Sequence, residues 1–323
     1  MNERLGGLSR RGLLGAGAAA AALLAGSGAA ASASGPKAGA SRMTLRWWGN
    51  NGWEIRVPSA DGRREKTILI DPWLTRFKTG TYTPEGADPK TPLSVNRALI
   101  DGYVDSGQLR ADHILVTHGH YDHLTDVPYL AKRTGATVFG TETHLSLMAA
   151  LGAPEDQLAV ASGGEYFAFD GYTVRILRSL HSAVGERAQV PFPGSRPLSR
   201  RDRPRTIADL LEGGTLAYLV TGGGAGVLDF GGSNYVESEL AGLAPDVLLM
   251  PTGGAAVSGY ADRLLRATGH PRYVAATHWD DFDFPLTDPP KDAGGLTALR
   301  AAVAAASPDS RFVVLDHLGS FVP

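Results

Sequence analysis

Residues 117–123 read Thr117-His118-Gly119-His120-Tyr121-Asp122-His123 and directly follow a short apolar run, residues 114–116. Three histidines and one aspartate therefore fall within six residues. Imidazole and carboxylate groups are costly to bury without a partner, and a divalent metal ion is the natural partner for such a cluster. This stretch predicts a metal site at the end of a strand.

The spacing of these four side chains indicates two metal ions. His118 and His120 lie two residues apart in an extended segment, so their side chains project the same way. Gly119 between them lets the backbone bend close to an ion. Asp122 and His123 lie at the turn into a following helix and face a second point. Two ions about 3.5–4 Å apart could use all four groups, as two-metal hydrolytic sites do.

Further candidate ligands stand at the ends of later strand-like runs. His181 follows residues 172–180, Asp229 closes residues 226–229, and His278 follows residues 273–277. Strands that end on polar groups in this way are expected to share one rim of a sheet system. An earlier run ends in Asp71-Pro72-Trp73, where Asp71 either forms a turn or supports the site from behind.

Composition limits the kinds of chemistry that the chain can carry. The chain has 323 residues, a formal net charge of −2 and no cysteine. That length suffices for a large core in one or two domains. Without cysteine, a metal site must use His, Asp and Glu, and disulfides and cysteine nucleophiles are excluded. The near-neutral charge predicts a small-molecule substrate as the partner and no nucleic acid.

The first residues are predicted to be an export signal. Arg10-Arg11 precede a weakly apolar Ala/Gly/Leu run, and Ala29-Ala30-Ala31 and Ala31-Ser32-Ala33 both fit a cleavage site. The alternative is a retained membrane anchor, which the Ala- and Gly-rich composition disfavours. We therefore expect residues 1–33 to be a twin-arginine signal and residues 34–42 a linker. The protein would be periplasmic or extracellular, without a stable membrane anchor after cleavage.

Two long loops interrupt the predicted strands and helices, at residues 75–110 and 184–212. The second loop either is a solvated surface segment or forms a lid that presents positive charge to an anionic substrate. Its arginines are Arg187, Arg196, Arg200, Arg201, Arg203 and Arg205. The remaining histidines, His113, His144, His270 and His317, are predicted to be surface or capping residues. Trp48 and Trp279 are predicted core residues that could also line a pocket.

The ordered set of motifs resembles the metallo-β-lactamase superfamily. The resemblance rests on His-x-His-x-Asp-His after an apolar strand, then an isolated His, a strand-end Asp and a final His. Residues 71–73 and 276–282 resemble one branch, which contains L-ascorbate-6-phosphate lactonase-like and N-acylphosphatidylethanolamine phospholipase D-like proteins. The resemblance implies an α+β fold, a four-layer αββα sandwich, over residues 43–323.

The resemblance also implies roles for the candidate ligands. His118, His120 and His181 would hold a first metal, and Asp122, His123 and His278 a second. Asp229 would bridge the two, and Asp122 would in addition orient the nucleophile or relay its proton. Two positions depart from the family pattern: Asn50 stands where relatives often carry His, and Leu228-Asp229-Phe230 replaces Gly-Asp-Thr.

The expected activity is that of an exported binuclear metal-dependent hydrolase. Two divalent ions would lower the pKa of a bridging water from 15.7 toward about 7, and the hydroxide would attack an ester, lactone or phosphodiester. Zinc is the expected metal, with manganese or iron as alternatives. Two other functions stay open at this point: a redox di-iron enzyme on the same scaffold, and a non-catalytic metal-binding protein.

Overall fold

The computed structural model describes residues 42–184 and 189–323. The predicted export signal, residues 1–33, and all of the predicted linker except Arg42 lie outside the described residues, as does Arg187. Within the described ranges, no helix combines the length and apolar character needed to cross a membrane.

The first half of the chain, together with the C-terminal strand β14, builds a seven-stranded sheet in the order β14-β1-β2-β3-β4-β5-β6. β14, β1, β2 and β3 pair antiparallel, whereas β3 to β6 pair parallel. The strands are β1 (Thr44–Trp47), β2 (Trp53–Pro58), β3 (Glu65–Ile70), β4 (His113–Leu115), β5 (Thr137–Gly140), β6 (Leu158–Val160) and β14 (Ser320–Phe321). The short β6 and β14 are the strands that the sequence did not predict.

The second half builds another seven-stranded sheet with the same sequence of pairings. Its order is β13-β12-β11-β10-β9-β8-β7, antiparallel from β7 to β10 and parallel from β10 to β13. The strands are β7 (Tyr166–Ala168), β8 (Tyr172–Ser179), β9 (Thr215–Gly222), β10 (Ala225–Asp229), β11 (Val247–Pro251), β12 (Tyr273–Thr277) and β13 (Arg311–Val313).

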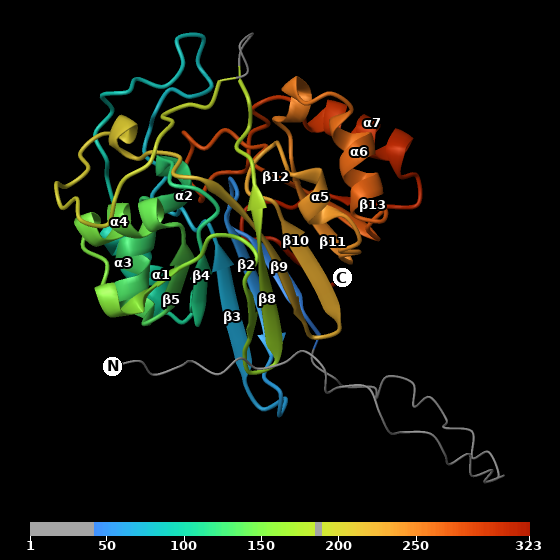
Figure 1. The fold of residues 1–323 in the computed structure, drawn as a ribbon, viewed down its shortest axis with the longest axis horizontal. Coiled ribbons are helices and arrows are strands. Elements are labelled where there is room, and N and C mark those ends of the chain that lie inside the picture. Colours follow the sequence, from blue (N-terminus) through green and yellow to red (C-terminus); the bar gives the residue numbers. More distant parts are fainter. Residues whose placement is uncertain (1–41, 185–188) are drawn as a thin grey trace, which may run out of the picture. The chain divides into compact units, whose positions relative to one another are not determined.

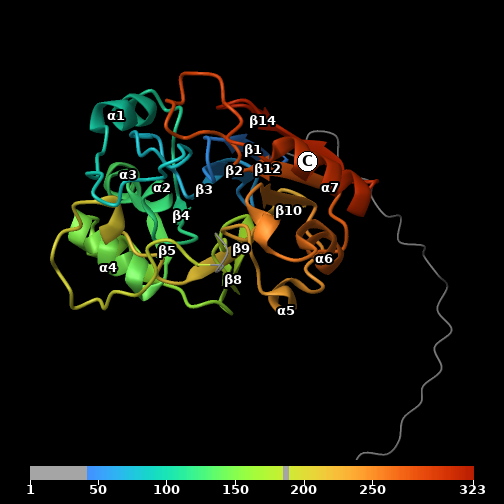
Figure 2. The same cartoon turned by 90° about the horizontal axis from the view of Figure 1, so that it is seen from above.

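Helices cover the outer face of each sheet. Figures 1 and 2 show α1, α3 and α4 beside the first sheet and α5, α6 and α7 beside the second, with both sheets between them. This arrangement confirms the predicted αββα sandwich. The helices are α1 (Arg97–Asp105), α2 (Tyr121–Leu124), α3 (Val127–Thr134), α4 (Glu142–Leu151), α5 (Glu237–Leu240), α6 (Tyr260–Ala267) and α7 (Leu296–Ala306), with 3-10 turns η1 (Glu155–Gln157), η2 (Ile207–Asp209) and η3 (Gly254–Ala256).

Two apolar clusters hold the layers together. One fills the space between the sheets and extends under α6 and α7, and it includes Trp47, Trp53 and Trp279. The other lies beneath α1, α3 and α4 and includes Trp48 and Trp73. Burying each such side chain contributes on the order of 2 kcal/mol or more. Trp48 and Trp279 are therefore core residues, and neither lines the cavity described below.

The predicted helix over residues 124–133 begins only at Val127, as α3, and a separate short helix, α2, carries the end of the histidine cluster. Pro128 lies in the first turn of α3, where its missing N–H costs nothing, so a new helix begins there. Asp126, at the junction, is buried and accepts hydrogen bonds from Leu74 N and Thr75 N, both at 2.7 Å. The break keeps Asp122 and His123 on a separate turn, α2, that faces the rim of the sheets.

Candidate metal centre

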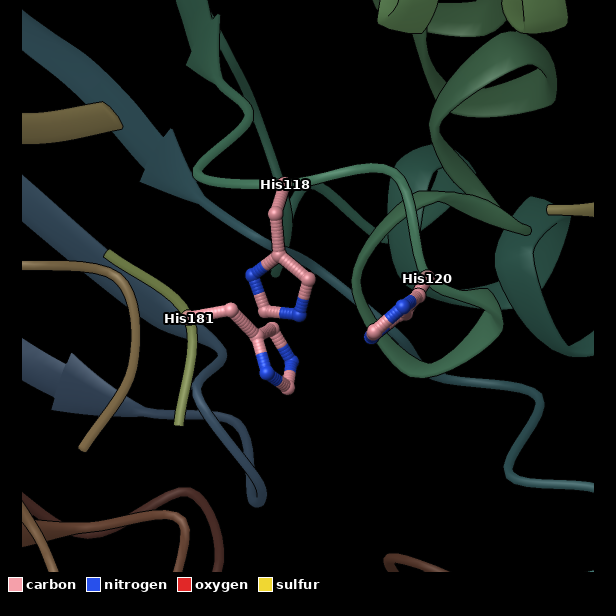
Figure 3. Close-up of side chains that lie close together, drawn as sticks. All are labelled: His118, His120 and His181. Atoms are coloured by element: carbon pink, nitrogen blue, oxygen red, sulfur yellow. The ribbon is translucent and has the colours of Figure 1, made fainter. Parts of the chain in front are cut away.

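Three histidines from two different sheets converge on one point. His118 follows β4, His120 is the N-cap of α2, and His181 follows β8. One ligand atom of each lies within 4.8 Å of the others, and Figure 3 shows the three rings turned toward one another. His120 Nε2 donates to the Pro191 carbonyl and His181 Nδ1 to the Ser182 carbonyl, each at 2.8 Å. Each of these two rings therefore has one nitrogen engaged and leaves the other available to a ligand.

The electrostatics of this group favour neutral imidazoles. Burial lowers the pKa of His118 well below its usual range, and the neighbouring histidines add to the effect. Burial and then His181 lower the pKa of His120 to about 3, and burial lowers that of His181. His118 Nε2 is buried without a hydrogen-bond partner among the described residues. A lone pair held neutral and unpartnered is what a divalent ion requires of its ligand.

Asp122, His123 and His278 form a second group beside the first. His123 Nε2 and His278 Nε2 lie 3.1 and 3.2 Å from Asp122 Oδ2, and all three ligand atoms fall within 4.8 Å. The His118 and His123 ring centroids are 3.8 Å apart, so the two groups adjoin. The structure thus brings together six of the seven residues predicted as ligands.

The positive charge of the second group lies on His123. Burial raises the pKa of Asp122, but His123 and His278 together outweigh burial, and the net shift is well downward. Burial lowers the pKa of His123, whereas the Asp122 and Asp71 carboxylates raise it, to about 10. The ring is therefore a cation between two carboxylates. A divalent ion bound at Nε2 would replace this proton.

Asp71 supports the site from behind and does more than form a turn. It accepts hydrogen bonds from His123 Nδ1 at 2.7 Å, from Thr117 N at 2.8 Å and from Asn51 Nδ2 at 2.9 Å. Its φ of 42° is unusual for a residue other than glycine, and such strain is kept where surrounding contacts fix the conformation. Asp71 therefore orients His123 in the way that carboxylates orient metal-bound histidines.

Asp229 is not a member of either ligand group. It is fully buried at the end of β10, where Oδ1 accepts from Gly231 N at 2.8 Å and Oδ2 from Asn51 Nδ2 at 3.1 Å. Burial, and then the charge of Asp71, raise its pKa to about 7. The predicted bridging of two metals by Asp229 stays a prediction.

Asn50 is a site residue that sequence reasoning noticed only as a departure from the family pattern. Its Nδ2 donates to the Asp122 carbonyl at 2.8 Å and lies 3.3 Å from Asp122 Oδ2. Its carbonyl accepts from His278 N at 2.8 Å, and its own N–H donates to Asp280 Oδ1 at 2.8 Å. The β1–β2 turn thereby connects both ends of the second ligand group.

A buried charge cluster fixes Asn50 in turn. Asp280 Oδ2 accepts from Arg76 Nη2 at 2.6 Å and lies 2.8 Å from His317 Nε2. The Asp280 and Arg76 side chains are fully buried, and that of His317 is 4% exposed. The prediction of a surface or capping role for His317 was therefore wrong. No sequence spacing connects residues 76, 280 and 317, so only the fold reveals this cluster.

His144 confirms the capping alternative. It lies at the third position of α4, where its N–H donates to Thr141 Oγ1 and its Nδ1 accepts from Thr141 N at 3.1 Å. Gly119 also has a packing role, and its predicted part in the approach to an ion stays a prediction. A Cβ there would lie 2.1 Å from the Leu211 carbonyl oxygen, so glycine lets the 184–212 loop pack against the ligand turn.

Comparison with known proteins identifies the family. A model of the beta-lactamase superfamily domain matches residues 44–278. The chain belongs to this superfamily. A UPF0173 metal-dependent hydrolase of Myxococcus xanthus is 28% identical over 273 residues, which cover 82% of this chain and 80% of that protein. The relatives of this superfamily member are thus named as metal-dependent hydrolases.

Solved structures support the fold. The metallo-beta-lactamase fold protein YhfI from Bacillus subtilis aligns with a TM-score of 0.52 at 13% identity, covering 87% of this chain and all 100% of that one. CmlA, a diiron beta-hydroxylase from Streptomyces venezuelae, aligns with a TM-score of 0.52 at 16% identity over 88% of this chain and 54% of that chain. At these identities the likeness shows the metallo-β-lactamase fold alone, and the predicted branch within the superfamily stays a prediction.

A cavity of about 560 Å³ opens above the ligand groups of this superfamily member. The ligands line it at one side, and apolar or aromatic side chains form much of the remaining wall. Among the residues that the structure describes, the wall includes no lysine or arginine. Its apolar members include Ala87, Val184, Pro191, Phe192 and Phe282, together with Tyr82 and Tyr121.

The arginine-rich loop borders this cavity through residues other than its arginines. Within its described part, residues 184 and 189–212, the cavity is lined by Val184, Pro191 and Phe192. Arg196 is 3% exposed and donates to Ser146 Oγ at 3.2 Å, which gives it a structural role. The described part of the loop therefore does not present the predicted positive charge to the site.

Proposed function

We propose that this protein is a binuclear metal-dependent hydrolase. The observation that carries the proposal is the pair of adjoining ligand groups, His118/His120/His181 and Asp122/His123/His278, at the side of one cavity. Its membership of the beta-lactamase superfamily and its metal-dependent hydrolase relatives support the same activity.

The donor set fits two divalent ions. Three neutral imidazoles, one of them with an unpartnered buried Nε2, form the first site, and two imidazoles with one carboxylate form the second. Nitrogen and oxygen donors of this kind suit zinc, and they also suit manganese or iron. We propose zinc as the native metal.

The chain's own residues prepare the site for hydrolysis. When bound, the ions would supply Lewis-acid polarisation of the scissile group and a lowered pKa for a water molecule. Asp71 and Asn50 hold His123 and Asp122 in place. Asp122 Oδ2, which lies between two histidines, can accept a proton or orient the attacking water. The aromatic wall formed with Phe192 and Phe282 excludes bulk water, and this strengthens the electrostatic interactions inside.

Within the expected ester, lactone and phosphodiester substrates, we propose an uncharged ester or lactone with an apolar substituent. The described wall offers aromatic and aliphatic surface and no basic side chain to pair with a phosphate. Anionic substrates would depend on the metal ions alone for charge compensation. The described wall therefore favours a neutral substrate over the alternative in which the loop presents positive charge to an anionic one.

The decisive experiment combines metal analysis with a substrate panel. Two zinc or manganese ions per chain and hydrolysis of neutral aryl esters or lactones would support the proposal. Iron with oxygen consumption would instead indicate the redox enzyme, and bound metal without turnover would indicate a binding protein. His120→Ala should remove activity and lower metal content, whereas the matched control His270→Ala, remote from the ligand groups, should retain both. Full activity and metal occupancy in His120→Ala would refute the assignment.

We further propose export through the twin-arginine route, with residues 1–33 removed, a linker over 34–42 and a hydrolase domain over 43–323. The proposal rests on the sequence of residues 1–33. Cell fractionation of a tagged protein tests it: Arg10→Lys/Arg11→Lys should leave the precursor inside the cell. Unchanged export of that variant would contradict the route.

A further inference from the structure

A second cavity, separate from the metal centre, collects four basic side chains. It measures about 600 Å³ and shares no lining residue with the cavity at the ligand groups. Arg97 comes from the start of α1, Lys132 from α3, and Arg203 and Arg205 from the arginine-rich loop. Two of the arginines that the sequence analysis singled out therefore lie here.

The walls of this cavity are fixed by backbone hydrogen bonds. Residues 91–93 run antiparallel to residues 205–207: Leu93 N donates to the Arg205 carbonyl at 2.9 Å, and Ile207 N to the Thr91 carbonyl at 3.0 Å. Asp209 Oδ2 accepts from Arg205 N at 2.8 Å and so holds the turn that follows. Arg203 and Arg205 are thus carried by an ordered segment.

The charge of the cavity is not compensated by neighbouring carboxylates. All four basic side chains are exposed, and the lining includes no aspartate or glutamate among the described residues. Two acidic groups nearby are already engaged: Asp101 accepts hydrogen bonds from Arg133 and the Tyr129 hydroxyl, and Asp209 accepts them from backbone N–H groups. By contrast, the adjacent loop residues Arg200 and Arg201 pair with Asp202 and Glu155.

We propose that this cavity binds a small anion that carries two or more phosphate groups. Each phosphate group carries about −1.5 to −2 charges at pH 7, so two groups match the four cations. Arginine forks bind phosphate oxygens in bidentate fashion. The volume suits a small molecule, and the Tyr129 ring, with the Arg97 guanidinium 5.1 Å from its centroid, forms a flat wall beside the charges.

The cavity adjoins the segment that carries two of the candidate metal ligands. Thr125 lines it from the α2–α3 junction, two residues beyond His123. The Thr125 hydroxyl donates to the Tyr121 carbonyl at 2.6 Å, so the junction and the ligand turn form one hydrogen-bonded unit. A bound anion would therefore brace the reverse side of the turn that carries Asp122 and His123.

Calorimetric titration of the full chain with inorganic pyrophosphate, at 50 mM and 300 mM NaCl, tests the proposal. Because pyrophosphate also binds metal ions, the informative comparison is between variants. Arg203→Ala/Arg205→Ala should weaken binding at least tenfold, and Lys132→Ala, on the opposite wall, several-fold. The matched control Arg200→Ala/Arg201→Ala removes two arginines from the same loop and should change affinity less than twofold.

Two outcomes would overturn the proposal. One is the absence of measurable pyrophosphate binding to the unaltered protein, and the other is equal weakening in the test and control double variants, which would indicate general surface electrostatics. Circular dichroism of each variant checks that the exposed substitutions leave the fold intact. Zinc content, measured in parallel, shows whether the metal centre is occupied. Failure of this proposal can therefore be told apart from failure of the proposed hydrolase function.

Discussion

The two cavities of this protein differ in how they obtain positive charge. The cavity at the candidate metal centre is walled by aromatic and aliphatic side chains and would take its positive charge from the ions that we propose bind there. The basic cavity, lined by Arg97, Lys132, Arg203 and Arg205, carries permanent charge and no ligand cluster. A metal-centred charge polarises one atom of a substrate, whereas spread cations hold an anion without reacting with it. The difference suggests catalysis at one cavity and binding at the other.

The largest expected effect concerns Asp126, at the junction between α2 and α3. Burial raises the pKa of this carboxyl from 3.8 to about 6. The folded state therefore binds the proton more tightly than the unfolded state, and the free energy of unfolding falls as pH rises from about 4 through 6. The shift corresponds to about 3 kcal/mol. In urea unfolding from pH 4 to 7, the wild type should lose more stability than Asp126→Asn, with a difference of about this size; parallel curves would contradict it.

Next in size is the effect of removing the support behind His123. Asp71→Ala should lower metal affinity by about 10- to 100-fold, the usual cost of deleting a carboxylate that orients a metal-bound histidine. Competition with a chromogenic chelator measures the change. Pyrophosphate binding at the basic cavity should stay within twofold, and a loss there of similar size would show that Asp71 maintains the fold as a whole.

The character of the apolar cavity predicts a smaller effect. Phe192→Lys places a charge in the wall, and we expect kcat/KM for a neutral aryl ester to fall about tenfold, roughly 1.4 kcal/mol, because the cation resists desolvation. A carboxylate-bearing ester should lose less or gain. Phe192→Leu serves as the control for lost volume. Equal losses for both esters would argue against selection by wall polarity.

The smallest expected effect is on turnover when the basic cavity is neutralised. Arg203→Ala/Arg205→Ala should keep kcat for a neutral ester within about twofold in the absence of polyanions, because neither side chain lines the metal cavity. Steady-state kinetics with and without pyrophosphate measure it. A loss of turnover in this double variant without pyrophosphate would indicate that the two cavities act as one functional site.

The ordered ligand motif, through its resemblance to a known superfamily, was sufficient for the fold class, and local patterns were sufficient for most of the centre. The cluster from His118 to His123, with His181 and His278 at later strand ends, is recognisable because metal ligands need particular residue types at short spacings. The alternation of strands and helices could also be predicted, since the periodicity of apolar residues is a local property of the sequence. Short edges such as β6 and β14 were missed because a run of two or three residues carries no periodic signal.

The remaining features depend on residues far apart in the chain. The cluster of Arg76, Asp280 and His317 holds Asn50, and through it Asp122, over separations that no local pattern encodes. The sequence alone showed that residues 196–205 concentrate positive charge. Packing decides that Arg196 is buried and that Arg203 and Arg205 line the basic cavity. Sequence determined which groups can bind metal, because that is a property of residue types. Only the tertiary structure decided which groups support them and where charge accumulates, because both depend on distances across the folded chain.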